Sequence, residues 1–543
     1  MNLSSIKKTF FNNKKETFLF IFLCLSLTWL KEINYLFYET LESPDYEKYS
    51  IYLDHFFTGK QTGKEHGIMY YYLHSLNYSL FFGDLNNFNF NIHKSIQNMN
   101  HYIFLFGLIG YYLLLRFFKF SKETIFITFI FINFFPPSIT MRLVLKPEIL
   151  AFALLPWIVY LVEKYKQDKN IVFLYLAIPL IVSAVTLKGN VLVIFGVYFL
   201  LTYFHLLLEL SVKNGILLFL TVFLSVLLLT LENNTSNGKN ILDIQSGSAL
   251  EETYNYKAPK SIIYNVDLYE LVSDPNKHNH ANSFIGITLL ETTGDYFDLY
   301  WDNDSVSYFK NRKEVIKSIQ SDEIIVPNFD MENITLSIFK QRDSDRYSRS
   351  SLGLLLSVFL YFNLIKSILI EEKYRKFMIM GFIAMGVLLF HSITGFPKNN
   401  FDPLVGDTFK PLYYSFALIF SFIFLIATKL KDKRVHFWQI IIYCLAVVFI
   451  LGFPKYYDYD VQVDLAPKIE NSIFCNIEKS IYLQQSDFED LSCDRTKNLV
   501  GTEDVNQMYK SGIKHKPFNM LFIILNFSVC FSLLFKKRFS RKD

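Results

Sequence analysis

The sequence predicts an all-α polytopic membrane protein with about twelve transmembrane helices and mixed extracytoplasmic loop segments, and three observations lead to this fold class. First, the 543 residues are 51% hydrophobic and only 19% charged, which is less charge than soluble domains usually carry. Second, uncharged apolar runs of about 17 to 22 residues recur, and this length crosses the hydrocarbon core of a bilayer. Third, Lys and Arg gather in alternate connections between these runs, as they do in cytoplasmic loops.

The apolar runs place the expected helices along the chain. The first run follows the basic stretch "KKTFFNNKKE" and lacks a small-residue cleavage site, so we expect a retained signal anchor. The expected spans lie near residues 17–35, 101–119, 122–138, 147–164, 170–187, 190–209, 214–231, 351–370, 375–393, 410–428, 435–453 and 517–535.

The basic residues predict the orientation. With the N-terminus inside, the inner connections read "RFFKFSKE", "VEKYKQDKN", "ELSVKNG", "EEKYRK", "TKLKDKR" and the tail "KKRFSRKD". All are rich in Lys and Arg, so both termini are expected in the cytoplasm and the chain in the inner (plasma) membrane as a multi-pass protein.

This topology divides the chain into five parts. We expect an N-terminal transmembrane module (1–231, with a first outer loop at 36–100), an extracytoplasmic segment (232–350), helices eight to eleven (351–453), an extracytoplasmic cap loop (454–516) and a last helix with a basic tail (517–543). The cap loop contains Cys475 and Cys493, the two of five cysteines that lie outside the expected spans. An oxidising exterior favours a disulfide between them, with two free thiols as the alternative.

The distribution of charge excludes several functions. The net charge of +4 is too small to indicate nucleic-acid binding, and there is no P-loop, GxGxxG, HExxH or paired CxxC. The expected spans are nearly free of ionisable groups, whereas ion-coupled transporters keep such groups at mid-depth. Polar residues gather instead at the outer ends of the spans, which favours an outward-facing site at the membrane surface.

The first polar cluster, "SPDYEKYSIYLDHFFTG", follows the first expected span. Ser43 is a good N-cap, Pro44 suits a first helical turn, and Asp45 follows it. Aromatic residues then recur at helical spacing, so this helix is expected to lie along the bilayer surface. Asp45 is a candidate catalytic acid or base, and the alternative is an acid that only stabilises the helix N-terminus.

A second cluster, "PPSITMRLVLKPEILAFALLPW", places cations at the outer ends of two spans. Arg142 and Lys146 lie where the positive-inside rule disfavours them, and Lys188 in "TLKGN" and Lys410 in "FKPLYY" extend the same electropositive region. Together these residues are candidates to hold a lipid phosphate. The alternative is an Arg142–Glu148 ion pair.

The third cluster, "SFIGITLLETTGDYFDLYW", combines carboxylates with aromatic rings. Asp295, Tyr296 and Trp301 suit a site that grips a sugar, with the ring stacked on the apolar sugar face and the carboxylate accepting hydroxyl protons. A surface loop with its aromatic rings at headgroup level is the alternative.

The first outer loop resembles that of the GT-C superfamily of membrane glycosyltransferases, which includes lipid A aminoarabinose transferases and protein O-mannosyltransferases. The similarity lies in Asp45, in Tyr49 four residues later, in a helix ending at Gly59 and in "HGIMYYYL". The elements "LKPEILAFALLPW", "TTGDYFDLYW" and "FKPLYYSFALIF" are similar to later parts of the family, so the resemblance extends to about residue 430. The "PPL" of many members is replaced by Gly67-Ile68-Met69, and the usual second acid after Asp45 is missing.

The resemblance implies an enzyme of cell-envelope glycan biosynthesis that takes a sugar from a polyprenyl-phosphate carrier. The acceptor would be a lipid, a glycan or a protein at the outer face. Asp45 would deprotonate the acceptor hydroxyl or bind a divalent metal, Mg or Mn, if one takes part. Glu65 and Glu148 are the two alternatives for a second acid. Arg142, Lys146, Lys188 and Lys410 would hold the carrier phosphate, and Tyr49, Asp295, Tyr296 and Trp301 would contact the sugar or the acceptor.

Other classes of protein remain alternatives at this point. An O-antigen polymerase or ligase is also multispanning and would depend on outer-loop arginines rather than on Asp45. A lipid or polysaccharide transporter would move its substrate without changing a glycosidic bond. A membrane scaffold would tolerate the loss of each of these charges.

Overall fold

The computed structural model describes residues 52–53, 67, 69–82, 88–143, 145–237, 266–273, 275, 283–292, 351, 353–371, 373–394 and 411–431. Every regular element within these residues is a helix, and this part of the chain contains no strand. The described part is therefore all-α, as the sequence predicts.

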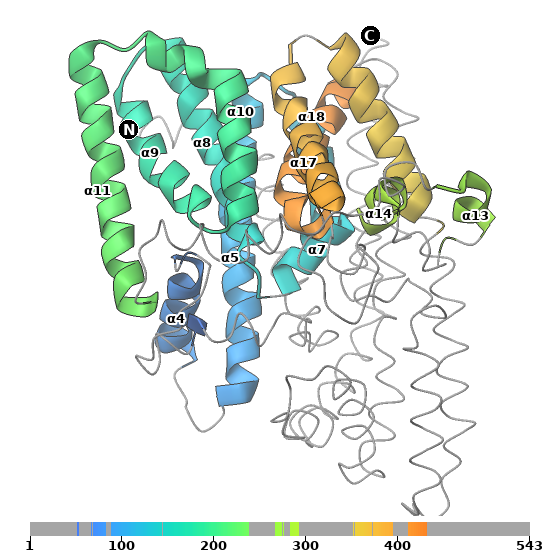
Figure 1. The fold of residues 1–543 in the computed structure, drawn as a ribbon, viewed down its shortest axis with the longest axis horizontal. Helices are drawn as coiled ribbons and strands as arrows, with labels where there is room; N and C mark the ends of the chain where they lie inside the picture. Colours follow the sequence, from blue (N-terminus) through green and yellow to red (C-terminus); the bar gives the residue numbers. More distant parts are fainter. Residues whose placement is uncertain are drawn as a thin grey trace, which may run out of the picture.

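Long helices stand side by side and form an upright bundle (Figure 1). They are α5 (Phe88–Phe117), α8 (Glu148–Asp168), α9 (Val172–Val185), α10 (Gly189–Leu208), α11 (Val212–Asn237), the helix Gly353–Ile370, α17 (Arg375–Thr394) and α18 (Ser415–Lys431). Helix α8 packs on α5 and α9, α11 packs on α9, and α17 packs on α18. All side chains of α18 from Ser415 to Ala427 are buried, which makes α18 a central helix of the bundle.

Shorter helices pack against the long ones. They are α4 (Met69–Phe81), α6 (Lys122–Phe134), α7 (Pro136–Leu143), α13 (Leu268–Ser273), α14 (Phe284–Glu291) and the 3₁₀ turn η5 (Pro411–Tyr414). Helix α4 lies against α5, α7 contacts α5 and α8, and α14 contacts η5 and α17. Figure 1 shows α4 beside the half of α5 that extends below the bundle.

Two helical segments of the described part, Gly189–Leu206 and Gly353–Ile370, are long and apolar enough to cross a membrane. Large apolar side chains are exposed on the bundle surface, among them Leu201 on α10, Phe219 on α11 and Leu369. Both features suit a membrane protein. The expected spans at 17–35, 435–453 and 517–535 lie outside the described residues, so the total of about twelve stays a prediction.

The expected span 122–138 is divided in two, contrary to the prediction. Helix α6 ends at Phe134, and Phe135 has an extended backbone with φ −69° and ψ 126° before α7 begins at Pro136. A residue that precedes proline is sterically driven out of the helical region, which explains the break. The break also frees the carbonyl groups at the end of α6 to accept other hydrogen bonds.

Helix α5 begins at Phe88, well before the expected start at residue 101. Its first half is polar, and hydropathy alone did not extend the span into it. The polar side chains are buried against α4: the Asn77 amide donates to the Ser95 carbonyl oxygen at 3.0 Å and to the Ser95 hydroxyl at 2.8 Å. Hydrogen bonds between the two helices thus satisfy polar groups that would otherwise be costly to bury.

Candidate functional site

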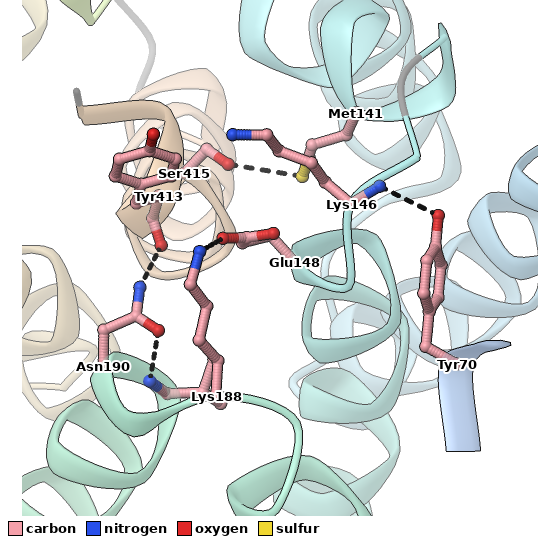
Figure 2. A network of polar contacts seen from close by, with 9 residues as sticks. Tyr70, Met141, Lys146, Glu148, Lys188, Asn190, Tyr413 and Ser415 are labelled. Carbon is pink, nitrogen blue, oxygen red and sulfur yellow. Dashed lines mark hydrogen bonds and ion pairs between the residues drawn. The ribbon is translucent and has the colours of Figure 1, made fainter. Parts of the chain in front are cut away.

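Two lysines and a glutamate meet at the ring of Tyr413 (Figure 2). The Lys188 ammonium lies 2.7 Å from Glu148 Oε1 and 4.4 Å from the centroid of the Tyr413 ring. The Lys146 ammonium lies 4.2 Å from the same centroid. At these distances the electron-rich face of the ring attracts both cations, so Tyr413 holds two like charges near one point.

Helix N-termini converge on this site. Glu148 is the first residue of α8, Lys188 directly precedes α10, and Tyr413 lies in η5 just before α18. The amide of Asn190 donates to the Tyr413 carbonyl oxygen at 2.8 Å, and its side-chain oxygen accepts from the Val191 N–H at 2.9 Å, which ties α10 to η5. The partial positive charge of each helix N-terminus adds to that of the lysines.

The three charged side chains are largely shielded from solvent. Lys146 and Glu148 are each 1% exposed, and the Lys188 side chain is 18% exposed. Together they carry one net positive charge, because one carboxylate faces two ammonium groups. Within the described part of the chain, Glu148 Oε2 has no hydrogen-bond partner. Among these three side chains the two ammonium groups outnumber the carboxylate, and this excess of positive charge, shielded from water, favours an anionic ligand.

Arg142 is buried beside this site, with a different set of contacts. Its Nε donates to the Ser138 carbonyl oxygen at 3.2 Å, its Nη2 donates to the Asn133 carbonyl oxygen at 2.6 Å, and the guanidinium lies 4.8 Å from the centroid of the Phe104 ring. Burial lowers the pKa of Arg142 to about 9, so the group stays charged at neutral pH. The guanidinium thus binds the Asn133 carbonyl group at the end of α6, which the break between α6 and α7 leaves without a continuing helix.

The sequence left two interpretations of the cations near the start of α8 open. They could hold a lipid phosphate, or Arg142 could form an ion pair with Glu148. Lys146 and Lys188 both lie at the Tyr413 ring, and Pro147 and Glu148 lie at the start of α8. Phosphate binding by the two lysines stays a prediction. The alternative Arg142–Glu148 ion pair does not form within the described residues, since Lys188 takes that place. The carboxylate prefers the lysine of the α9–α10 turn, while Arg142 points to backbone carbonyl groups.

The other predicted site residues lie outside the described part of the chain. They are Asp45, Tyr49, Glu65, Asp295, Tyr296, Trp301, Lys410, Cys475 and Cys493. The catalytic, sugar-binding and disulfide assignments of these residues stay predictions. Among the described residues no group of three or more His, Cys, Asp and Glu side chains is suited to a metal ion, and Asp45 is not among those residues.

Sequence reasoning missed three residues of the site. Tyr413 receives both lysines, Asn190 anchors the Tyr413 backbone, and Tyr70 accepts a hydrogen bond from the Lys146 backbone N–H at 3.0 Å. The signal for Tyr413 was its place in "KPLYY" at the outer start of an expected span, where interfacial tyrosines are common. For Tyr70 and Asn190 no local signal exists, because their partners are distant in sequence.

Comparisons with protein-family models, with curated proteins and with solved structures find no match to this chain. Two ammonium groups held over one ring, close to the N-termini of α8, α10 and α18, are suited to bind phosphate oxygens.

Proposed function

We propose that the protein is a multi-pass glycosyltransferase of the GT-C type in the inner membrane, with both termini in the cytoplasm. It transfers a sugar from a polyprenyl-phosphate carrier to a lipid, glycan or protein acceptor on the extracytoplasmic face. The observation that carries this proposal is the cationic site of Lys146, Lys188, Glu148 and Tyr413 at the ends of the bundle helices.

The placement of charge supports an extracytoplasmic site. Helix α8 runs from Glu148 at the site to Lys164 and Lys166 near its other end, and α18 runs from Ser415 to Lys429 and Lys431. The basic connections thus lie at the end of the bundle opposite the site. Because short cytoplasmic loops carry the excess of Lys and Arg, the end with the site faces outward in this proposal.

The lysines suit the charge changes of sugar transfer. The acceptor oxygen forms a bond to the anomeric carbon of the sugar, the bond from that carbon to the phosphate oxygen breaks, and the acceptor proton passes to a base. The carrier phosphodiester becomes a monoester and gains negative charge. Lys146 and Lys188 stabilise this growing charge, which is the role that preorganised cations play in transition states. Asp45 is the proposed base.

Glu148 has a separate role in this proposal. Its carboxylate is paired with Lys188, and this pair fixes the ammonium group that would otherwise move on a flexible four-carbon chain. Glu148 therefore orients Lys188 rather than accepting the proton of the sugar acceptor. Glu65 remains the alternative as a second acid.

Binding of lipid phosphate tests the proposal. Purified wild-type protein is titrated with undecaprenyl phosphate and with undecaprenol, which has the same chain and no phosphate. We expect the wild type to prefer the phosphate lipid and Lys188→Ala to lose about tenfold in affinity for it, as for a charged hydrogen bond. Lys169→Ala is the matched control, because Lys169 also pairs with a carboxylate at 2.7 Å but is exposed and lies at the C-terminal end of α8, opposite Glu148. Equal binding of both lipids by the wild type would contradict the proposal.

A further inference from the structure

The stretch from Gly67 to Tyr70 contacts both of the turns that carry the site lysines. The Gly67 N–H donates to the carbonyl oxygen of Leu187 at 3.3 Å, next to Lys188. The Tyr70 hydroxyl accepts from the Lys146 N–H at 3.0 Å (Figure 2). Gly67 therefore contacts the connection from α9 to α10, and Tyr70, at the start of α4, contacts the connection from α7 to α8.

The contact at Gly67 admits no side chain. A Cβ atom added at Gly67 would lie 2.1 Å from the carbonyl oxygen of Thr186 and 2.8 Å from its carbonyl carbon. Real Cβ atoms do not approach backbone atoms so closely, and the obstacle is backbone rather than a flexible side chain. Only glycine lets the chain lie directly against the turn that carries Lys188.

Tyr70 and Asn100 hold both ends of the connection between Arg142 and Lys146. The Tyr70 hydroxyl donates to Asn100 Oδ1 at 2.8 Å while it accepts from the Lys146 N–H. The Asn100 amide donates to the Arg142 carbonyl oxygen at 3.4 Å. Asn100 thus binds the carbonyl group at the start of this connection, and Tyr70 binds the N–H group at its end.

The Tyr70 hydroxyl is held in place by its surroundings. Tyr70 and Asn100 are both fully buried, and the Tyr70 ring packs edge-on against Tyr71 and His74, with centroids 5.2 Å and 4.4 Å away. A buried hydroxyl that both donates and accepts uses its hydrogen-bonding capacity in one fixed geometry. Tyr70→Phe removes the hydroxyl and keeps the ring. The Lys146 N–H and Asn100 Oδ1 then both lose the hydrogen bond to that hydroxyl.

We infer that Tyr70 and Asn100 are positioning residues that place Lys146 for phosphate binding, and that Gly67 places the turn of Lys188 in the same way. The inference rests on the proposed function, because it concerns the same cationic site. It adds that affinity for the phosphate group depends on buried residues that do not touch the ligand.

Tyr70→Phe tests the inference, with Tyr111→Phe as its matched control. Tyr111 is equally buried on α5, and its hydroxyl has no hydrogen-bond partner within the described residues. We expect Tyr70→Phe to bind undecaprenyl phosphate about fivefold more weakly than the wild type, as for one lost hydrogen bond. Binding of undecaprenol is expected to stay unchanged, and so is binding of either lipid by Tyr111→Phe. A variant with a general loss of structure would lose affinity for both lipids. A loss of affinity for the phosphate lipid alone therefore indicates that Tyr70 positions Lys146.

The outcomes separate this inference from the proposed function. If the wild type binds both lipids equally, the proposed function fails. Suppose instead that the wild type prefers the phosphate lipid and that Lys188→Ala weakens this preference. If Tyr70→Phe then binds the phosphate lipid with wild-type affinity, the positioning role is overturned and the phosphate site stands.

Asn100→Ser removes the hydrogen-bond partner of the Tyr70 hydroxyl, and we expect the same loss of affinity for the phosphate lipid alone. Wild-type affinity in this variant also overturns the inference.

Discussion

Lys188 and Glu148 lie 40 residues apart in the sequence and form an ion pair of 2.7 Å in which the carboxylate is almost completely buried. The pair joins the start of α8 to the turn before α10. It also brings the Lys188 ammonium to the ring of Tyr413, where Lys146 lies on the same aromatic group. One ion pair thus fixes two helices and builds a cationic site.

Lys188→Ala is expected to lower the free energy of unfolding by about 3 kcal/mol, because it leaves the buried Glu148 carboxylate without its cation. Lys169→Ala should change it by less than about 1 kcal/mol, since that pair is exposed. Thermal unfolding of the purified variants measures both effects. Adding Glu148→Gln to Lys188→Ala should restore part of the loss. Equal stability of the two single variants would show that the buried pair contributes nothing.

Gly67→Ala is expected to destabilise the protein by more than about 2 kcal/mol, because the new methyl group would collide with the Thr186 carbonyl. Gly196→Ala is the control: nothing lies within 4 Å of its added Cβ, and alanine favours the interior of α10. Thermal unfolding should show a loss for the first variant and no loss for the second. Wild-type stability of Gly67→Ala would mean that the chain does not approach the Lys188 turn so closely.

Stability should fall between pH 6.5 and pH 5 in part through His74. Burial lowers the pKa of this side chain from 6.5 to about 3, so below pH 6.5 the unfolded chain binds a proton that the folded chain does not. The stabilisation is complete above pH 6.5 and is lost as the pH falls toward 3. The loss between pH 6.5 and pH 5 is about 1.5 to 2 kcal/mol.

The comparison with His74→Asn isolates this contribution. Unfolding of both proteins is followed across the same pH interval, and the variant should lose less stability than the wild type. Asn100 and Tyr70 surround His74 and carry no charge at these pH values, so they do not titrate with it. Parallel pH profiles would contradict a buried neutral His74.

Lys376→Met should separate stability from ligand binding. Lys376 pairs with the buried Glu163, which also accepts a hydrogen bond from the Tyr203 hydroxyl at 2.8 Å, at the end of α8 opposite the site. Loss of this pair is expected to cost about 3 kcal/mol of unfolding free energy. Affinity for undecaprenyl phosphate should stay at the wild-type value. A weakened affinity in a folded variant would show that the two ends of the bundle are coupled.

Proline and glycine in the sequence predicted where a helix starts and where the chain turns. Pro147 marks the start of α8, and the glycine in "TLKGN" marks the turn of Lys188, because both residue types restrict or permit particular backbone angles. Hydropathy located most of the long helices of the described part to within a few residues, but it missed the polar first half of α5. It failed at Phe135, where the two prolines that follow break an otherwise continuous apolar run.

The contacts that complete the site were beyond the reach of sequence patterns. The Tyr70 hydroxyl meets a backbone group 76 residues away, and Asn190 meets the Tyr413 carbonyl 223 residues away. Such contacts depend on how the helices pack against one another. The local sequence around either partner does not predict them. The Arg142 side chain also binds the Asn133 carbonyl oxygen, which is available because α6 ends at Phe134.

The most direct test of the central claim is glycan profiling by mass spectrometry in a deletion strain complemented with the wild type, Lys188→Ala or Asp45→Asn, with protein levels in the membrane checked. We expect that deletion removes one sugar from a surface glycan or glycolipid. The wild type should restore that sugar, and both variants should fail to restore it at full protein level. An unchanged profile in the deletion strain, or full restoration by both variants, would contradict a glycosyltransferase that uses this site.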